Sequence, residues 1–343
     1  MSLPSTVQAP RPELLHRCPG GLAPGGPEPV VVGHRGACGY RPEHTLASYA
    51  LAARMGADYV SVDLVVTADE QLVARHESEL SSSTDVARRH ELADLRRVRH
   101  LDGYAVQGWF ADDLTLDQLR RLRAVERYPH LRHGSVLYDG LLDVPTLEEV
   151  LQLRAALVGQ LGRALGLVLA VRCPDRRQVT TTWRLLQRHD LDRPDGPVML
   201  AAESLTVLEA LRAEGARLPL AWRALAGECE PTDLRRAAAV AQVVATDKQV
   251  VMPRRLDGRL GEPTGWVERA HRLGLAVHAW TFRADNVHLP TDLQIGNDPS
   301  RLGHGAREMR RFARAGVDGW ATDHADRGVL ARRSDEHPAV GGA

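Results

Sequence analysis

Short apolar runs that end in glycine or in a polar residue recur along the whole chain, and amphipathic stretches lie between most of them. A short apolar run is typical of a strand buried on both faces, whereas apolar residues at i, i+3 and i+4 are typical of a helix. Because this alternation does not change midway, we expect one α/β domain, a (β/α)8 or TIM barrel, rather than two doubly wound domains. The runs that we interpret as strands begin at Val30, Asp58, Gln71, Leu165, Pro197, Leu218, Val243, Leu275 and Val317.

The alternation starts near residue 29 and divides the chain into three parts. Residues 1–28 are rich in proline and glycine without periodicity, so we expect a disordered or loosely attached lead-in. Residues 29–332 are expected to form the barrel, and residues 333–343 a flexible tail. Two long segments, residues 84–144 and 284–301, interrupt the alternation after strands, and we expect these insertions to form walls of a substrate pocket.

The composition excludes several classes of partner. The 44 Lys and Arg residues balance 44 Asp and Glu residues, so no global charge attracts nucleic acid or an acidic membrane surface. The four cysteines lie far apart without a C-x-x-C pair, which indicates free thiols. The N-terminus lacks the apolar core of a signal peptide, and no run is long enough to span a membrane. We therefore expect a soluble cytoplasmic protein that acts on a small molecule, as a monomer or a homodimer.

Polar residues stand at the ends of the first predicted strands. His34 and Arg35 follow the first strand and His76 closes the third, and the carboxyl ends of barrel strands line the ligand crevice. Ser61 and Asp63 lie two residues apart, so they point to the same side of the second strand. Two histidines across an anionic centre can split a phosphodiester, one taking a proton and the other giving one. Arg35 offers paired donors to a phosphate. Asp63 either offers oxygen ligands to a divalent cation or pairs with Arg35 or Arg172 as an interior carboxylate.

The run HRGACGYRPEHTLASYALAARMGADYVSVDLVVTADEQLVARHESEL, residues 34–80, resembles the N-terminal signature of the glycerophosphodiester phosphodiesterase family. Two later segments, DGRLGEPTGWVERAHRLGLAVHAWTFRADN and AGVDGWATDHAD, resemble the corresponding segments of bacterial periplasmic-type members. The likeness extends from Val30 to about Leu330. It implies a barrel that hydrolyses a glycerophosphodiester to an alcohol and glycerol 3-phosphate.

The resemblance also implies a role for each polar residue of the signature. His34 and His76 fall on the general acid and base of the family, and Arg35 falls on its phosphate-binding arginine. Asp63 falls on one carboxylate of the metal site. Glu43, in RPEHT, falls on a glutamate that borders the pocket and is a second candidate metal ligand.

Several positions depart from the family pattern. Ser61 and Ala170 stand where the pattern has glutamates, Arg172 stands where it has lysine, and Glu77 follows His76 where aspartate is usual. Carboxylate oxygens are the ligands that hard cations require, so we expect a divalent cation, Ca²⁺ or Mg²⁺, to be weakly bound or absent. Arg172 is expected to bind phosphate oxygens and to replace part of the missing metal charge.

Three further residues receive predictions. Trp280 is expected to line the substrate pocket, and Phe282 is interpreted either as a second pocket wall or as core. Asp323, in ATDHAD, is expected to cap the following turn.

Three functions remain open at this point. The first is a metal-assisted phosphodiesterase that uses His34 and His76. The second is a catalytically impaired relative that keeps the barrel as a phosphate-ligand binding or regulatory module, as the replacement of two metal carboxylates suggests. The third is a phospholipase D-like enzyme that cyclises its product, and it is the least favoured because it normally needs the same carboxylates.

Overall fold

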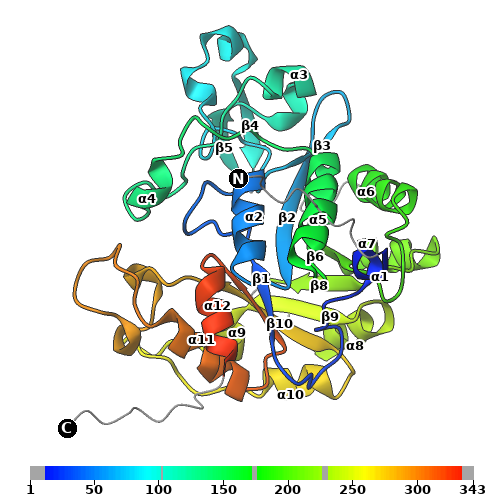
Figure 1. Ribbon diagram of the computed structural model, residues 1–343, viewed down its shortest axis with the longest axis vertical. Helices are drawn as coiled ribbons and strands as arrows, with labels where there is room; N and C mark the ends of the chain where they lie inside the picture. Colours follow the sequence, from blue (N-terminus) through cyan, green and yellow to red (C-terminus); the bar gives the residue numbers. More distant parts are fainter. Residues whose placement is uncertain (1–11, 102, 172–175, 226–230, 334–343) are drawn as a thin grey trace, which may run out of the picture.

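The computed structural model describes residues 12–101, 103–171, 176–225 and 231–333. Within these ranges eight parallel strands close into a barrel, because β1 pairs with both β11 and β2. The strands follow one another round the barrel in chain order, which confirms the predicted fold (Figure 1). The barrel strands are β1 (Val30–Gly33), β2 (Tyr59–Val66), β6 (Gly166–Val171), β7 (Val198–Ala202), β8 (Leu220–Ala224), β9 (Val243–Asp247), β10 (Ala276–Phe282) and β11 (Gly319–Thr322).

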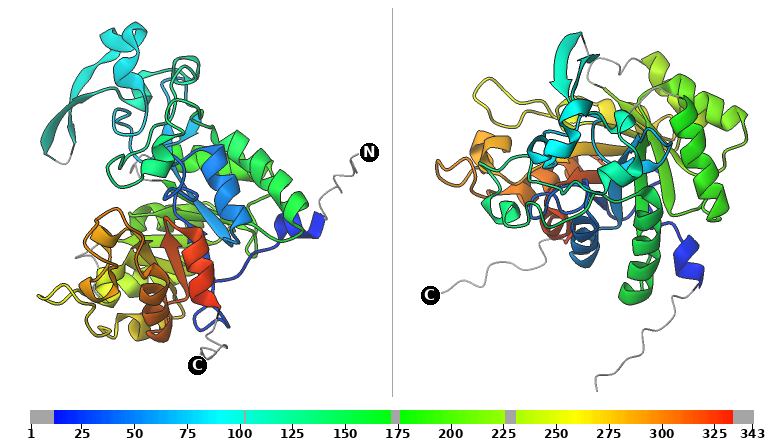
Figure 2. Two further views of the ribbon diagram at one scale, coloured as in Figure 1. Left: turned by 60° about the vertical axis from the view of Figure 1, so that its left-hand side comes forward. Right: turned by 90° about the horizontal axis from the view of Figure 1, so that it is seen from above.

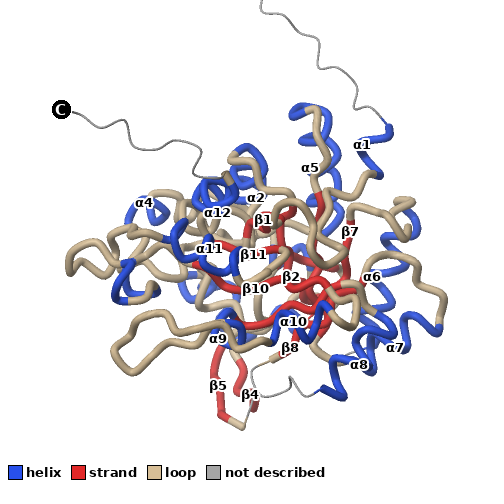
Figure 3. The backbone as a smooth tube through the Cα atoms, turned by 90° about the horizontal axis from the view of Figure 1, so that it is seen from below, coloured by secondary structure: helices blue, strands red, loops and turns tan. Residues whose placement is uncertain are grey.

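Helices surround the barrel, and Figure 3 shows the barrel strands at the centre with helices outside them. Thr45 and Thr146 begin α2 and α5 by accepting hydrogen bonds from backbone N–H groups of the first turns, and a left-handed Gly162 ends α5. No helix within the described ranges is both long enough and apolar enough to cross a membrane. The helices around the barrel are α2 (Leu46–Arg54), α5 (Leu147–Leu161), α6 (Arg176–Arg188), α7 (Leu205–Ala213), α8 (Pro231–Val240), α9 (Lys248–Val251), α10 (Trp266–His271), α11 (Gly305–Arg314) and α12 (Ala325–Arg332).

The third apolar run does not form a barrel strand. It folds as β3 (Leu72–Ala74), which runs antiparallel to β2 after a turn at residues 67–71. A turn of this length cannot hold the crossover helix that a parallel strand needs, so the next barrel strand is β6. The expectation that His76 closes a barrel strand is therefore wrong, since His76 lies two residues beyond β3.

The first insertion, residues 84–144, builds a separate apolar cluster around Trp109 and Leu114. A two-stranded hairpin projects from it, and Figure 2 shows the hairpin extending away from the barrel. The second insertion consists of short turns of helix after β10. The elements of the two insertions are η1 (Val86–Arg88), η2 (His90–Leu95), β4 (Arg97–Leu101), β5 (Tyr104–Gly108), η3 (Ala111–Asp113), α3 (Leu116–Leu119), α4 (His133–Val136), η4 (Asn286–His288) and η5 (Thr291–Leu293).

Residues 12–28, the N-terminal strap, are bound to the barrel rather than loosely attached. Its helix α1 (Pro12–His16) packs against α5. Leu22 packs against the apolar cluster inside the barrel, and the Nε2 of His278 lies 2.9 Å from the carbonyl oxygen of Gly21. The expectation of a loose lead-in is wrong for these residues because leucines of α1 and Leu22 pack against the barrel and its helices, and several backbone carbonyls have partners. Residues 1–11 and 334–343 lie outside the described ranges.

His278 is expected to make the stability of the protein fall as the pH falls below about 6.5. Burial lowers the pKa of this histidine below its usual value of 6.5. Between the two pKa values the unfolded chain binds one proton more than the folded protein, so the free energy of unfolding falls by at most about 1.4 kcal/mol per pH unit from this group. His278→Gln keeps a donor for Gly21 but removes the titration. Urea unfolding between pH 7.5 and 5 should show a shallower slope for the variant, and equal slopes would contradict the prediction.

Candidate active site

A cavity of about 70 Å³ lies inside the barrel. Alanine, valine and methionine side chains form most of its wall, so any specific binding depends on the few polar residues that face it. Several of these stand near the carboxyl ends of strands, as expected for a barrel site. The other lining residues are His34, Ser61, Asp63, Arg223, His278 and Trp280.

The loop between β1 and α2 holds Arg35 in the left-handed backbone region. Its φ angle is 55°, which is costly for a residue with a side chain and persists only where neighbours hold it. The backbone N–H of Arg35 donates to the Oγ of Ser61 (2.9 Å), and the Oγ of Ser48 donates to the Arg35 carbonyl (3.2 Å). Ser61 therefore helps to hold the loop that carries Arg35.

Asp63 lies at the centre of a buried cluster of positive and polar groups. Its Oδ2 is 3.1 Å from the Nε2 of His44 and 3.4 Å from the Nε of Arg35, and its Oδ1 is 3.4 Å from the Nη1 of Arg223. Burial alone would raise the pKa of Asp63, but the hydrogen bond from His44 and the charges of the two arginines outweigh it and hold the pKa well below its usual value. Asp63 is thus a carboxylate with both oxygens in contact with protein donors.

Glu43 continues this network toward the surface. Glu43 accepts hydrogen bonds from the Nη1 of Arg35 (2.7 Å) and from two nitrogens of Arg127 (2.7 and 3.0 Å). Arg127 belongs to the first insertion. Arg127 also donates to Glu77 (2.6 Å), whose carboxylate contacts the Nδ1 of His76. The first insertion therefore contributes directly to the site, and His76 is joined to the site through a chain of ion pairs.

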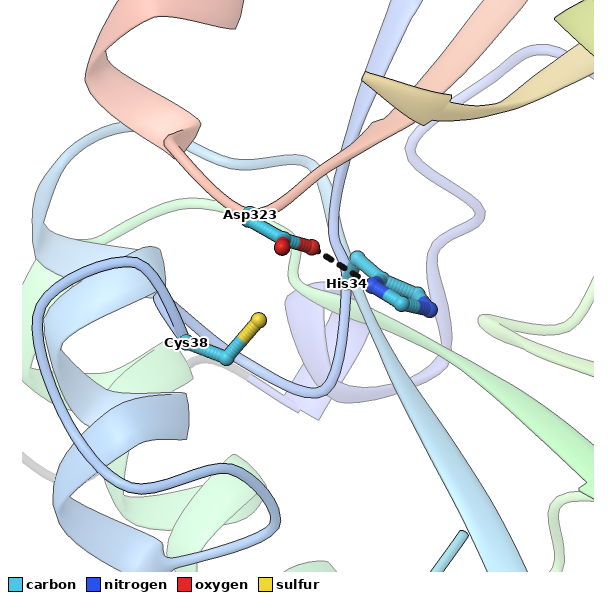
Figure 4. Close-up of side chains that lie close together, drawn as sticks. All are labelled: His34, Cys38 and Asp323. Carbon is cyan, nitrogen blue, oxygen red and sulfur yellow. Dashed lines mark hydrogen bonds and ion pairs between the residues drawn. The ribbon is translucent and has the colours of Figure 1, made fainter. Parts of the chain in front are cut away.

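His34 and Asp323 form a second polar group at the cavity, shown in Figure 4. The Nδ1 of His34 lies 2.7 Å from the Oδ1 of Asp323, which leaves the Nε2 directed away from the carboxylate. Burial and the nearby Arg35 lower the pKa of His34 to about 4, although the hydrogen bond with Asp323 opposes this shift. His34 is therefore neutral near pH 7, and a proton on Nδ1, donated to Asp323, makes Nε2 a proton acceptor.

The carboxylate of Asp323 has two further partners. Arg132 donates to its Oδ2, and the Nε of Arg283 lies 3.0 Å from the same atom. Arg132 comes from the first insertion and Arg283 precedes the second. The expectation that Asp323 caps the next turn is wrong, because α12 begins after His324 and has no side-chain cap.

The described residues do not fit a divalent cation. Asp63 and Glu43, the predicted ligands, already contact three arginines, and an ion 2.0–2.6 Å from their oxygens would have to displace these groups. One group of three side chains has ligand atoms within 4.8 Å of one another, namely His34, Cys38 and Asp323. There, burial raises the pKa of the Cys38 thiol well above its usual value, which disfavours the thiolate that a metal binds, and Asp323 already contacts two arginines.

The remaining predicted residues lie in different places. Ala170 lines the cavity beside Asp63 on the neighbouring strand, where its methyl group coordinates nothing. Trp280 lines the same cavity, whereas Phe282 is buried in the core. Arg172 lies outside the described residues, so its predicted contact with phosphate stays a prediction. Cys18 and Cys38 are free thiols, as expected.

Sequence reasoning missed several residues of the site, among them His44, Arg127, Arg223 and the role of Asp323. The signal for Arg223 was present, because LAWRA places one arginine in an apolar strand with the same face as Ala221. No comparable local signal marks Arg127, which lies within a long insertion.

The fold and the site together define an α/β-barrel protein with a buried histidine–aspartate pair and clustered arginines at the carboxyl ends of its strands. The chain belongs to the glycerophosphoryl diester phosphodiesterase family, whose model matches residues 34–327.

Curated relatives match only part of their length. A glycerophosphodiester phosphodiesterase from Treponema pallidum is 33% identical over 155 residues, which is 43% of this chain and 41% of the relative. One from Bacillus subtilis is 36% identical over 125 residues, 36% of this chain and 35% of the relative. The matched region thus spans less than half of these relatives.

Solved structures match nearly the whole fold. A putative glycerophosphoryl diester phosphodiesterase from Silicibacter pomeroyi has a TM-score of 0.62 at 24% identity and covers 90% of this chain and 94% of its own. An Oleispira antarctica phosphodiesterase, in complex with the product sn-glycerol-3-phosphate, has a TM-score of 0.58 at 18% identity, over 89% and 96% of the two chains. At these identities the likeness concerns the fold.

Proposed function

We propose that this protein is a hydrolase that cleaves a glycerophosphodiester to an alcohol and glycerol 3-phosphate. The observation that carries the proposal is the pair formed by His34 and Asp323 at the cavity, beside Arg35. The family membership and the product named for the Oleispira antarctica structure support the same reaction. The substrate is a small molecule, and the proposal involves no nucleic acid.

His34 acts in this proposal as the general base. Its neutral ring is oriented by Asp323, so the Nε2 can take a proton from the oxygen that attacks phosphorus. Arg35, held by Ser61 and Ser48, donates N–H groups to the phosphate oxygens. His76, oriented by Glu77, gives a proton to the leaving alcohol.

A second function is favoured by one specific observation, the presence of Ser61 and Ala170 where the family pattern has metal-binding glutamates. Under this alternative the barrel keeps its phosphate pocket as a binding or regulatory module without turnover. Substituting Ser61→Glu together with Ala170→Glu would create activity from none under the alternative and would change an existing activity under the first proposal.

Incubation of the purified protein with glycerophosphocholine tests the first proposal directly. Release of glycerol 3-phosphate is measured by an enzyme-coupled assay, with the His34→Gln variant as the control for contaminating activity. We expect release by the parent protein and at least a hundredfold less by the variant. Binding of glycerol 3-phosphate without turnover of any glycerophosphodiester would instead support the binding module.

A further inference from the structure

Arg223 reaches the cavity from β8 at the place where the family pattern has its metal site. Ala170 is paired with Asp63 across β2 and β6, and Ser61 lies two residues before Asp63 on the same side of β2. All three line the cavity together with Arg223. The two missing glutamates and the arginine thus belong to one cavity, and the arginine contacts the one carboxylate that remains.

The guanidinium of Arg223 contacts Asp63 and Trp280, and the side chain also faces the cavity. Its Nη1 lies 3.4 Å from the Oδ1 of Asp63, and its central carbon lies 5.6 Å from the centre of the Trp280 ring. The side chain is 15% exposed and lines the cavity. A guanidinium carries five N–H donors in a plane, and the contacts that the structure describes use one of them. The others are available to an anion in the cavity.

The charges around the cavity are balanced without a metal ion. The described carboxylates of the network are each paired with at least one arginine, so no carboxylate is left to attract a dication. An anion in the cavity would accept charge-assisted hydrogen bonds from the remaining N–H groups of the partly buried Arg223 guanidinium. The groups that balance one another are Asp63, Glu43 and Glu77 with Arg35, Arg127 and Arg223.

We propose that Arg223 replaces the divalent cation of the family pattern, so that this site binds a phosphodiester and its phosphate monoester product without a metal ion. This inference rests on the proposed function, because it names the group that neutralises phosphate charge in the same site. Arg223 is permanently charged and cannot be removed by a chelator. The site therefore keeps its affinity for phosphate esters in EDTA.

Calorimetric titration with glycerol 3-phosphate tests the proposal on the full chain. The protein is stripped with EDTA and titrated with and without added Ca²⁺ or Mg²⁺, and each metal is also titrated alone. We expect the ligand affinity to differ by less than twofold between these conditions, with no measurable heat from either metal alone. Affinity that appears only after a metal is added, with metal binding to the protein, would overturn the proposal and leave the proposed function standing.

Two variants of Arg223 separate its charge from its hydrogen bond. Arg223→Gln keeps a donor for Asp63 without the charge, and we expect glycerol 3-phosphate to bind at least thirtyfold more weakly. Arg223→Lys keeps the charge, and we expect a loss of less than tenfold. Arg236→Gln, which breaks a surface ion pair with Glu209, is the matched control and should bind like the parent.

The outcomes are distinguishable. Equal affinity of the Gln variant and the parent would overturn the role of Arg223. Absence of any binding by the parent, with or without metal, would overturn the proposed function together with this inference. If both Arg223 variants fail to fold, the metal titrations of the parent still decide whether the site works without a cation.

Discussion

Replacing His34 by glutamine is expected to lower the turnover of glycerophosphocholine by about 10²–10⁴-fold, while the affinity for glycerol 3-phosphate changes by only a few fold. The variant removes the proton acceptor but leaves Arg35 and Arg223 in place to bind phosphate. Because burial and Arg35 lower the pKa of His34 to about 4, turnover of the parent should fall as the pH drops through about 4 rather than through 6.5. Steady-state kinetics and calorimetry measure the two effects.

An exposed histidine provides the control for this experiment. His100 lies on the projecting hairpin, and His100→Gln should leave turnover unchanged. Turnover by the His34→Gln variant within threefold of the parent would show that another group is the base. A loss of turnover with an equal loss of affinity would indicate that His34 binds the phosphate rather than moving a proton.

Replacing Asp63 by alanine is expected to lower the free energy of unfolding by about 3–5 kcal/mol. Asp63 is 4% exposed and lies against Arg35, Arg223 and His44, so its removal leaves Arg223 without its described opposite charge, Arg35 with Glu43 alone and His44 without its acceptor. The loss is mostly the cost of these groups that lose a partner rather than the strength of any one contact. Urea unfolding of the parent and the variant measures the difference.

A surface ion pair provides the control for this loss of stability. Asp117 is 82% exposed and pairs with Arg121, so Asp117→Ala should change the free energy of unfolding by less than about 0.5 kcal/mol. A loss below 1 kcal/mol for Asp63→Ala would contradict the cluster as described. Stabilisation of the parent by added Ca²⁺ would also contradict it, because it would mean that a cation competes with the arginines.

The barrel could be predicted because its strands are the most regular signal in the sequence. The apolar run beginning at Val243, for example, predicts a strand from its local sequence, and the structure has a strand there. The prediction of a barrel strand at Gln71 was wrong because an apolar pattern does not show which strand the run pairs with. The short turn at residues 67–71 makes the run pair antiparallel with β2.

Only those residues of the site that lie close together in the sequence could be predicted. His34, Arg35 and Asp63 stand in one recognisable signature, and the structure brings them together. Asp323, Arg127 and Arg223 lie far from that signature along the chain, and their positions depend on barrel closure and on the path of an insertion. A carboxylate after a strand predicts a turn cap as readily as a partner for a histidine, so the role of Asp323 could not be read from its local sequence.

The N-terminal strap has a consequence for how substrate enters the barrel and how products leave it. Leu22 packs against the apolar cluster inside the barrel, and the carbonyl oxygen of Gly21 is hydrogen-bonded to His278 on β10. The strap therefore covers part of the amino-terminal end of the barrel. Under the proposed reaction, we expect substrate to enter and both products to leave at the carboxyl-terminal end. Glycerol 3-phosphate that has not yet departed would then obstruct the next substrate, and inhibition by this product should be competitive.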